Sequence, residues 1–136
     1  MTLAPRRVLP RLDALNRPFW TGGAAGELRI VQCRGCAAYI HPPQPVCRHC
    51  LSDDVVPKAV VKTGTVASFT INHQAWMPGM EVPFVIARVA LDGAPGVYLT
   101  TNIINCPVHE VNIGDRVRVS FLQQEDVWLP LFEKVG

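Results

Sequence analysis

The chain has 136 residues, enough for one ordinary domain or two very small ones and too few for a large enzyme with a separate cofactor domain. Its composition, 49% hydrophobic and 18% charged, predicts a folded core and excludes a disordered tail. The formal net charge of +2 is too small to predict, by itself, binding to nucleic acid or to an anionic membrane.

No segment of the sequence has the pattern of a targeting or membrane-spanning element. Residues 1–7 are basic, but no unbroken apolar run follows them, so we expect no signal peptide. The longest apolar stretches, 84–91 and 97–104, have less than half of the roughly 20 residues that cross a bilayer. We therefore expect a cytoplasmic protein in a reducing compartment, where clustered cysteines are more often metal ligands than disulfides.

Residues 1–27 are predicted to form an N-terminal helical arm. Its apolar residues recur at intervals of four, three and four, the spacing of one helix face: Val8, Leu12, Leu15 and Phe19. Prolines limit the length of any helix here, and Asn16 is a plausible N-cap for a short helical piece that carries Phe19 and Trp20. These two aromatic side chains are large for a short arm, so we predict that they contact a partner or an acyl group.

The next two regions are predicted to be extended. Residues 28–60 carry four of the five cysteines on short extended pieces, with too little apolar material for a core of their own. Residues 61–136 contain five strand-like runs separated by turn signals: 64–73, 84–91, 97–104, 116–124 and 128–135. Five antiparallel strands predict a small barrel or sandwich, and a C-terminal OB-type barrel has this strand count and size.

Two C-x-x-C pairs, separated by ten residues, form the strongest chemical signal: Cys33 and Cys36, then Cys47 and Cys50. Each pair can aim two sulfurs at one point, and four thiolates select zinc, or less often iron. A closed four-sulfur site has no open position for substrate, so we expect a structural Zn²⁺. A redox C-x-x-C is the alternative, but that motif normally occurs singly at the start of a helix.

The other candidate residues do not form a catalytic set. We interpret His41 and His49 as groups near the metal or at the surface, and His109 as a solvated side chain. Cys106 stands alone and is expected to behave as a small apolar residue. Without an acid/base pair or an activated nucleophile, we predict no catalytic residue and regard a free-standing enzyme as the weakest reading.

The connection at residues 72–83 is more apolar than a surface loop should be, because it carries Trp76, Met77 and Met80 beside His73. Flat aromatic and unbranched side chains suit an adaptable contact with an acyl chain or with another protein. The alternative is that the loop folds back and covers the core of its own barrel. We therefore name these four residues as candidate partner- or acyl-binding residues.

The order of motifs resembles that of the DUF35 family, the acyl-CoA-associated OB-fold proteins with a rubredoxin-like zinc ribbon. The resemblance covers the chain from about residue 13 to the end, and its motifs are, in order: Pro18-Phe19-Trp20, Gly26-Glu27-Leu28, Cys33-x-x-Cys36, Pro42-Pro43, Cys47-x-x-Cys50, Gly64-Thr65-Val66-x-Ser68-Phe69-Thr70, Pro83-Phe84-Val85, Thr101-Asn102-Ile103 and Gly114-Asp115-x-Val117. One departure is Ala37, where a glycine is common in the family.

The resemblance implies three parts: a helical arm (1–27), a zinc ribbon (28–60) and an OB-fold domain (61–136). It also implies a non-catalytic or co-catalytic accessory subunit of lipid or steroid metabolism. Such a subunit forms a hetero-oligomer with a thiolase-like enzyme, a lipid-transfer-type thiolase or steroid side-chain aldolase, or with a MaoC-type hydratase, and helps to bind or position an acyl-CoA thioester. The zinc role carries over to the four paired cysteines.

The alternative function is a single-stranded nucleic-acid-binding module, since zinc ribbons and OB barrels both serve that purpose. Such a module needs Lys and Arg along a groove with aromatic side chains that stack on bases. The runs 64–73 and 97–104 contain no Lys or Arg, and 84–91 contains only Arg88. The sequence therefore favours the accessory subunit.

Overall fold

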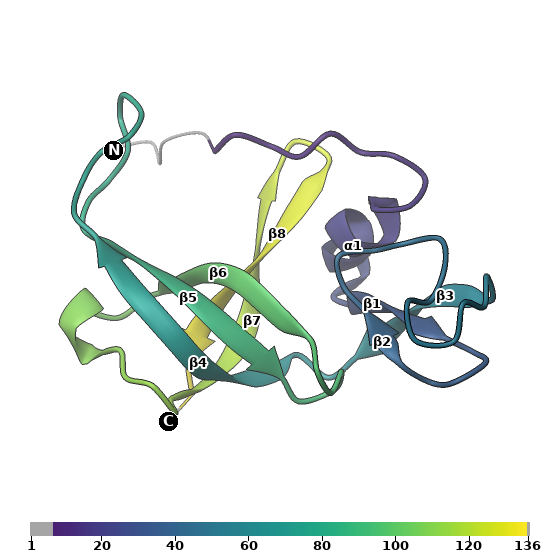
Figure 1. Ribbon diagram of the computed structural model, residues 1–136. Helices are drawn as coiled ribbons and strands as arrows, with labels where there is room; N and C mark the ends of the chain where they lie inside the picture. Colours follow the sequence, from purple (N-terminus) through teal and green to yellow (C-terminus); the bar gives the residue numbers. More distant parts are fainter. Residues whose placement is uncertain (1–6, 136) are drawn as a thin grey trace.

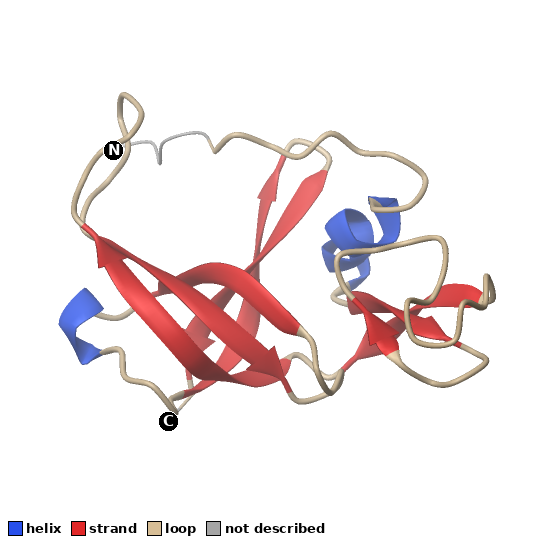
Figure 2. Ribbon diagram, in the orientation of Figure 1, coloured by secondary structure: helices blue, strands red, loops and turns tan. Residues whose placement is uncertain are grey.

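The computed structural model describes residues 7–135 and contains two β-sheet units that lie side by side (Figure 1). Strands dominate the described chain, with a short α-helix and two short 3-10 turns (Figure 2). The first unit is the three-stranded sheet β2-β1-β3, and the second is the closed barrel β4-β5-β6-β8-β7. This architecture confirms the predicted fold class, which is mainly β with a zinc ribbon and a five-stranded OB-type barrel.

In the ribbon sheet, β1 (Leu28–Cys33) is the central strand. It pairs antiparallel with β2 (Tyr39–Ile40) on one edge and with β3 (Val55–Val60) on the other. The segment between β2 and β3 has no regular secondary structure and carries the second cysteine pair. The sheet thus brings the two cysteine pairs to the same end of β1.

The barrel strands lie within one residue of the predicted runs: β4 (Thr63–Asn72), β5 (Phe84–Leu91), β6 (Tyr98–Ile104), β7 (Arg116–Gln124) and β8 (Val127–Lys134). A 3-10 turn, η2 (Val108–Glu110), connects β6 to β7. The strands pair antiparallel except β6 and β8, which are parallel and share only two residue pairs, Ile103 with Phe132 and Ile104 with Glu133. The barrel therefore closes on a very short ladder.

One hydrophobic core runs from the barrel into the ribbon. Leu28 and Ile30 of β1 are fully buried and belong to the same cluster as Val89 and Phe132 of the barrel. The rest of the ribbon has only a small cluster of its own, made of Val31, Ile40 and the buried Cys33 and Cys47. The ribbon thus shares the barrel core at one end and depends on its cysteines at the other.

The arm is less helical than its apolar spacing predicts. Only α1 (Arg17–Thr21) is α-helical, and the 3-10 turn η1 (Gly22–Ala25) follows it, whereas residues 7–16 are not helical. The carboxylate of Asp13 accepts hydrogen bonds from the backbone N–H of Leu15 and Asn16, at 2.9 and 2.7 Å, which stabilises a turn in place of a helix. Leu9 and Leu12 pack instead against β8.

Asn16 is the N-cap residue of α1, as predicted, but its side chain makes no capping bond to the helix. Its amide oxygen accepts from the backbone N–H of Asp13 at 2.9 Å instead. The backbone of Gly23 packs closely against Trp128 and Phe121 of the barrel. A Cβ at Gly23 would collide with Trp128 and lie 2.8 Å from Phe121, so this contact of the arm with the barrel requires a glycine. No described helix is long and apolar enough to cross a membrane.

Candidate metal centre and binding surfaces

The two cysteine pairs form matching backbone turns. The N–H of Ala37 donates to the carbonyl of Cys33 at 2.8 Å, and the N–H of Leu51 donates to the carbonyl of Cys47 at 2.9 Å. Ala37 and Leu51 both have left-handed backbone angles, with φ of 67° and 65°. Because each turn needs a positive φ after its second cysteine, a glycine suits this position best, and Ala37 adopts the same conformation despite its Cβ.

The two turns bring all four sulfurs together. The Sγ atoms of Cys33, Cys36, Cys47 and Cys50 lie within 4.8 Å of one another, and the pairs Cys33–Cys50 and Cys36–Cys47 are 3.5 and 3.6 Å apart. Four sulfurs at Zn–S bonds of about 2.3 Å would be about 3.8 Å apart in a tetrahedron. The donor set and the spacing therefore fit a four-thiolate zinc ion, and the chain carries a ribbon whose cysteines can bind zinc.

Backbone donors favour the thiolate form of the buried sulfurs. The N–H of Cys50, followed by that of His49, lowers the pKa of Cys47 to about 7. The backbone N–H of Cys36 likewise lowers the pKa of Cys33. The backbone N–H of Ser52 acts in the same way on Cys50, but the neighbouring sulfurs of Cys33, Cys36 and Cys47, together with burial, outweigh it and raise the pKa of Cys50 to about 12. A cation between the sulfurs would remove this conflict, because it stabilises every thiolate.

The remaining histidines and the fifth cysteine lie in separate places. His41 is half-buried, and its ring lies 4.7 Å from that of Phe19, in the hydrophobic arm contact. His109 is exposed. Cys106 is half-buried, and burial raises the pKa of its thiol, as expected for a small apolar residue. Within residues 7–135 we find no arrangement of these groups that resembles a catalytic triad or dyad.

The two aromatic residues of the arm differ in exposure. Phe19 is only 6% exposed and belongs to the hydrophobic core, whereas Trp20 is half-buried. Their rings meet edge to face with centroids 4.8 Å apart. Phe19 therefore has little surface left for a partner, and Trp20 is the arm residue that remains available for a contact.

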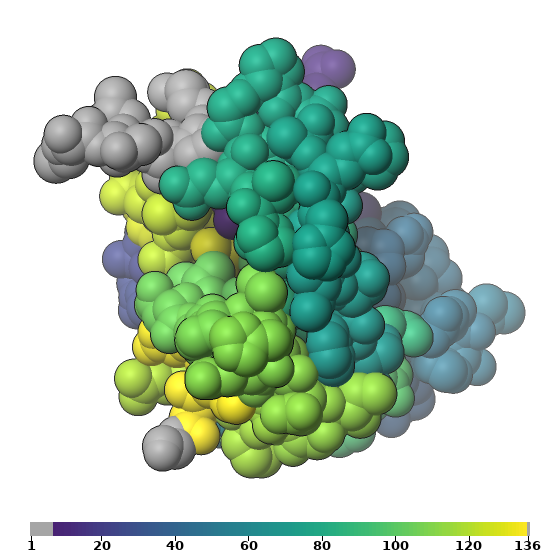
Figure 3. All heavy atoms as spheres, turned by 90° about the vertical axis from the view of Figure 1, so that its left-hand side faces the viewer, coloured from purple at the N-terminus to yellow at the C-terminus, as the bar shows by residue number. Residues whose placement is uncertain are grey.

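The other candidate residues lie on the loop between β4 and β5, at the opposite end of the barrel from α1 (Figure 1). His73, Trp76 and Met77 are exposed, and Met80 is half-buried. Trp76 is 68% exposed, although its Nε1–H donates to the Asn72 side chain at 2.9 Å. The loop projects from the ends of β4 and β5 and does not fold back over the barrel core (Figure 1), and its atoms stand at the top of the face drawn in Figure 3. The candidate residues thus form two separate surfaces.

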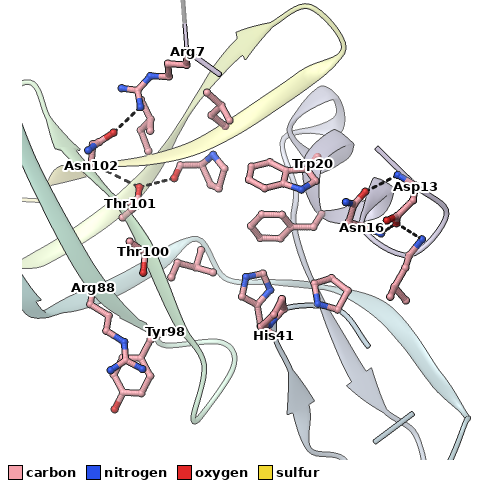
Figure 4. A pocket seen from close by; sticks show the side chains of 18 residues that line it. Arg7, Asp13, Asn16, Trp20, His41, Arg88, Tyr98, Thr100, Thr101 and Asn102 are labelled. Atoms are coloured by element: carbon pink, nitrogen blue, oxygen red, sulfur yellow. Dashed lines mark hydrogen bonds between the residues drawn. The ribbon is translucent and has the colours of Figure 1, made fainter. Parts of the chain in front are cut away.

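A cleft of about 720 Å³ lies between the arm, the ribbon and the barrel, and the sequence did not indicate it. Arg7, Arg88, Tyr98 and Asn102 face it from the barrel side, and Trp20 lies across from them (Figure 4). The Arg7 guanidinium donates to the side chain of Asn102 at 2.6 Å, and burial lowers the pKa of Arg7. These residues are far apart in the sequence, so only a prediction of the strand order could have grouped them.

Family models match two consecutive parts of the chain. The model described as "ChsH2, rubredoxin-like zinc ribbon domain" matches residues 20–56. The model described as "ChsH2, C-terminal OB-fold domain" matches residues 58–122. The two matches cover the ribbon and most of the barrel that the structure contains.

Two curated relatives are similar over most of this chain. A "Probable enoyl-CoA hydratase alpha subunit" of Thermomonospora curvata is 33% identical over 132 residues, which are 94% of this chain and 40% of the relative. The "3-oxo-4,17-pregnadiene-20-carboxyl-CoA hydratase alpha subunit" of Mycobacterium tuberculosis is 36% identical over 125 residues, 84% of this chain and 38% of the relative. The chain thus spans about two fifths of the length of these curated relatives.

Two solved structures have the same fold. A chain of the structure described as "Ltp2-ChsH2(DUF35) aldolase" is 30% identical, with a TM-score of 0.82 over 93% of this chain and 98% of that chain. A DUF35 protein of unknown function from Sulfolobus solfataricus is 17% identical, with a TM-score of 0.58 over 86% of this chain and 82% of that chain, and supports the fold alone. On the first of these likenesses and the two family models, the chain belongs to the DUF35 family and combines a ChsH2-type rubredoxin-like zinc ribbon with an OB-fold barrel.

Proposed function

We propose that this chain is a non-catalytic or co-catalytic accessory subunit that binds a thiolase-like enzyme, a lipid-transfer-type thiolase or a steroid side-chain aldolase. The observation that carries the proposal is the 30% identity and TM-score of 0.82 to a chain of an Ltp2-ChsH2(DUF35) aldolase, matched over 98% of that chain. The described residues add no catalytic constellation that would favour a free-standing enzyme. We place the protein in the cytoplasm, whose reducing conditions keep zinc-binding thiols free.

The loop between β4 and β5 is our candidate for the contact with the partner and the acyl group. It presents Trp76, Met77 and Val82, which are 68, 39 and 41% exposed, on one projecting segment. Aromatic and methionine side chains dominate the centres of protein interfaces, and a methionine can also adapt to an acyl chain. The loop thereby helps to position an acyl-CoA thioester at the interface with the enzyme.

Co-expression tests this function directly. The full chain is produced with thiolase-like proteins of the lipid-transfer type from its host, and the complexes are measured by size-exclusion chromatography with light scattering. We expect a stable hetero-oligomer that Trp76→Ser weakens by at least about tenfold. Val61→Ser, at an exposed apolar residue outside the loop, is the matched control and should leave the affinity unchanged. A chain that stays monomeric with every such enzyme contradicts the proposal.

A MaoC-type hydratase is the second candidate partner, because both curated relatives are named hydratase alpha subunits and are much longer than this chain. The same co-expression with hydratase subunits in place of thiolases separates the two partners. Preferential assembly with a hydratase would replace the thiolase in the proposal and keep the accessory role.

We also propose that Cys33, Cys36, Cys47 and Cys50 are the ligands of one structural Zn²⁺. The fit of their sulfur distances to a zinc tetrahedron supports this assignment. Metal analysis of the purified chain should give about one zinc per chain, and each single Cys→Ser variant should lower it sharply. Cys106→Ser is the control and should retain full zinc. Full occupancy in any of the four ligand variants would contradict the assignment of that cysteine.

A further inference from the structure

β6 and β8 pair only at their C-terminal parts, so the first half of β6 has one edge without a neighbouring strand. β6 pairs with β5 from Tyr98 to Ile103, but with β8 only at Ile103 and Ile104. The first half of β6 therefore has a strand on one side only, and its other side borders the cleft, which residues 98–102 line. Neither the comparisons nor the proposed loop contact assigns a role to this edge.

The register indicates which backbone groups face the cleft. The N–H of Leu91 donates to the carbonyl of Val97, so these two residues form a hydrogen-bonded pair at the start of the β5–β6 ladder. Hydrogen-bonded and non-hydrogen-bonded pairs alternate in an antiparallel ladder, and the β5–β6 register continues without a shift. Tyr98 and Thr100 therefore direct their backbone N–H and C=O groups away from β5, toward the cleft.

The opposite wall of the cleft is apolar. Leu129 and Leu131 of β8 pack with Trp20 of the arm in one cluster, and all three line the cleft. Between these leucines stands Pro130, which has no N–H, and its carbonyl already accepts a bond from the hydroxyl of Thr101 at 2.7 Å. The backbone donors and acceptors that face the cleft from the barrel are thus on β6, and the apolar contacts are on β8 and the arm. On the ribbon side, the buried Nδ1 of His41 also has no hydrogen-bond partner among the described residues.

The charges around this edge favour an acidic occupant. Arg88 stacks on the ring of Tyr98 with 4.3 Å between the guanidinium carbon and the ring centroid, and Arg7 bonds to Asn102. Among residues 7–135, none of the ion pairs includes Arg7 or Arg88. The described carboxylate on the cleft wall, Asp13, is already engaged by two backbone N–H groups. Among the described residues that line the cleft, two arginines outside any ion pair therefore stand against one aspartate, which leaves an excess of positive charge.

We propose that this cleft binds an extended, acidic segment of a partner protein, which adds to the free edge of β6 as a short strand. The backbone of the segment pairs with Tyr98 and Thr100, its apolar side chains contact the Leu129, Leu131 and Trp20 wall, and its carboxylates pair with Arg7 and Arg88. An added strand uses alternating donors and acceptors at strand spacing, together with pockets for alternate side chains. A small anion would satisfy the arginines but not the backbone edge, so the peptide is the better fit.

The probe is a displayed library of random nonapeptides, selected on the zinc-loaded full chain. The proposal expects enriched sequences in which Asp or Glu alternates with apolar residues, and it expects the amides of Tyr98 and Thr100 to shift in NMR titrations with the synthetic peptides. The peptide should give strand-type nuclear Overhauser contacts to β6. Library selection without enrichment, or enriched peptides that shift only residues outside the cleft, would overturn the proposal.

Two pairs of variants separate backbone pairing from general charge effects. Thr100→Pro removes the edge N–H and should weaken peptide binding by about tenfold or more, whereas Thr100→Ala retains the N–H and should bind within about twofold of the parent. Arg88→Glu should weaken binding by about tenfold, and Lys58→Glu, the same charge change at an exposed ribbon residue, should not.

Arg88→Glu needs no change of backbone, so it keeps the proposal testable if Thr100→Pro fails to fold. Inorganic phosphate, acetate and free CoA are added to the parent chain as competing probes. If one of them binds in the cleft with the same dependence on Arg88, and the selected peptides do not respond to Thr100→Pro, the cleft is a small-anion site and the peptide proposal is wrong.

Discussion

The barrel and the ribbon are stabilised in different ways although they share part of one core. The barrel buries large side chains from every strand, among them Val66, Val89, Val117 and Phe132, all with no exposed area. Apart from Leu28 and Ile30, the ribbon buries little more than Val31, Ile40 and two cysteines.

Zinc removal should have the largest effect, and it should be local. Structural zinc contributes on the order of 10 kcal/mol to folding in comparable small modules, so chelation should unfold the two cysteine turns of the ribbon before the barrel. Amide hydrogen exchange should become fast at residues 34–54 and stay slow in β4 to β8. Unchanged exchange and melting after verified zinc loss would contradict a metal-dependent ribbon.

Truncation of the barrel core should have the next largest effect. Phe132→Ala removes a fully buried ring and should lower the free energy of unfolding by about 3–5 kcal/mol, measured by urea denaturation. Phe84→Ala, at a half-buried residue outside the core cluster, is the control and should cost clearly less. An equal loss in both variants would show that burial in this cluster does not determine barrel stability.

Relief of the backbone strain at Ala37 should produce a small gain in the ribbon. Ala37→Gly places a glycine at φ 67° and should stabilise the zinc-bound turn by about 0.5–1 kcal/mol, which is about two- to fivefold tighter zinc binding in a chelator competition. Ala38→Gly, next to it at an ordinary φ, should not tighten binding. Equal effects of the two variants would mean that the left-handed angle carries no strain.

The smallest effect should come from the surface ion pair that joins the β5–β6 turn to β7. Hydrogen bonds from Arg116, then from Thr63, lower the pKa of Asp92 to about 2, below its unfolded value of about 3.9. The stabilisation is therefore complete above about pH 4 and is lost as the pH falls toward 2. Because both side chains are partly solvated, Asp92→Asn should cost at most about 1 kcal/mol at pH 7.

Urea denaturation of Asp92→Asn and of the parent chain, from pH 7 to pH 2.5, tests whether the stabilisation by Asp92 decreases as the pH falls. Zinc release in acid affects both chains equally, so the difference between them reports on Asp92. The difference should shrink below pH 4, and Asp126→Asn, at an exposed aspartate of the β7–β8 turn, should show no such trend. If the difference in the free energy of unfolding grew in acid instead, the ionised Asp92 carboxylate would not be the stabilising form.

The sequence predicted the parts of the molecule that local patterns determine. Alternation along β7, with Val117 buried between exposed arginines, identified a barrel strand, and two identical cysteine spacings identified the metal centre. The arm was predicted less well: of the helically spaced Val8, Leu12 and Leu15, only Leu12 packs against β8, and it does so beside Leu9 from a non-helical segment. The Asp13 carboxylate accepts hydrogen bonds from the backbone N–H groups of Leu15 and Asn16, which favour a turn over a helix, and the spacing of apolar residues does not predict such bonds.

The cleft could not be predicted because it depends on strand order. Arg7, Arg88 and Asn102 line the same cleft only because β6 lies between β5 and β8 and because the arm packs against β8. Burial of Phe19 also depends on tertiary packing, since β1 and His41 of the ribbon cover it. The sequence left open whether the loop of Trp76 folds back over the barrel, and it did not predict the hydrogen bond from Trp76 to Asn72.

The shared burial of Leu28 and Ile30 limits how the two units can move. Any hinge between them would have to lie after these residues, because bending earlier would pull two fully buried side chains out of the barrel core. We therefore expect the first half of β1 to move together with the barrel, and any hinge motion to involve the cysteine-bearing tip of the ribbon. A partner would meet a cleft whose barrel side is preformed and whose ribbon side alone can adjust.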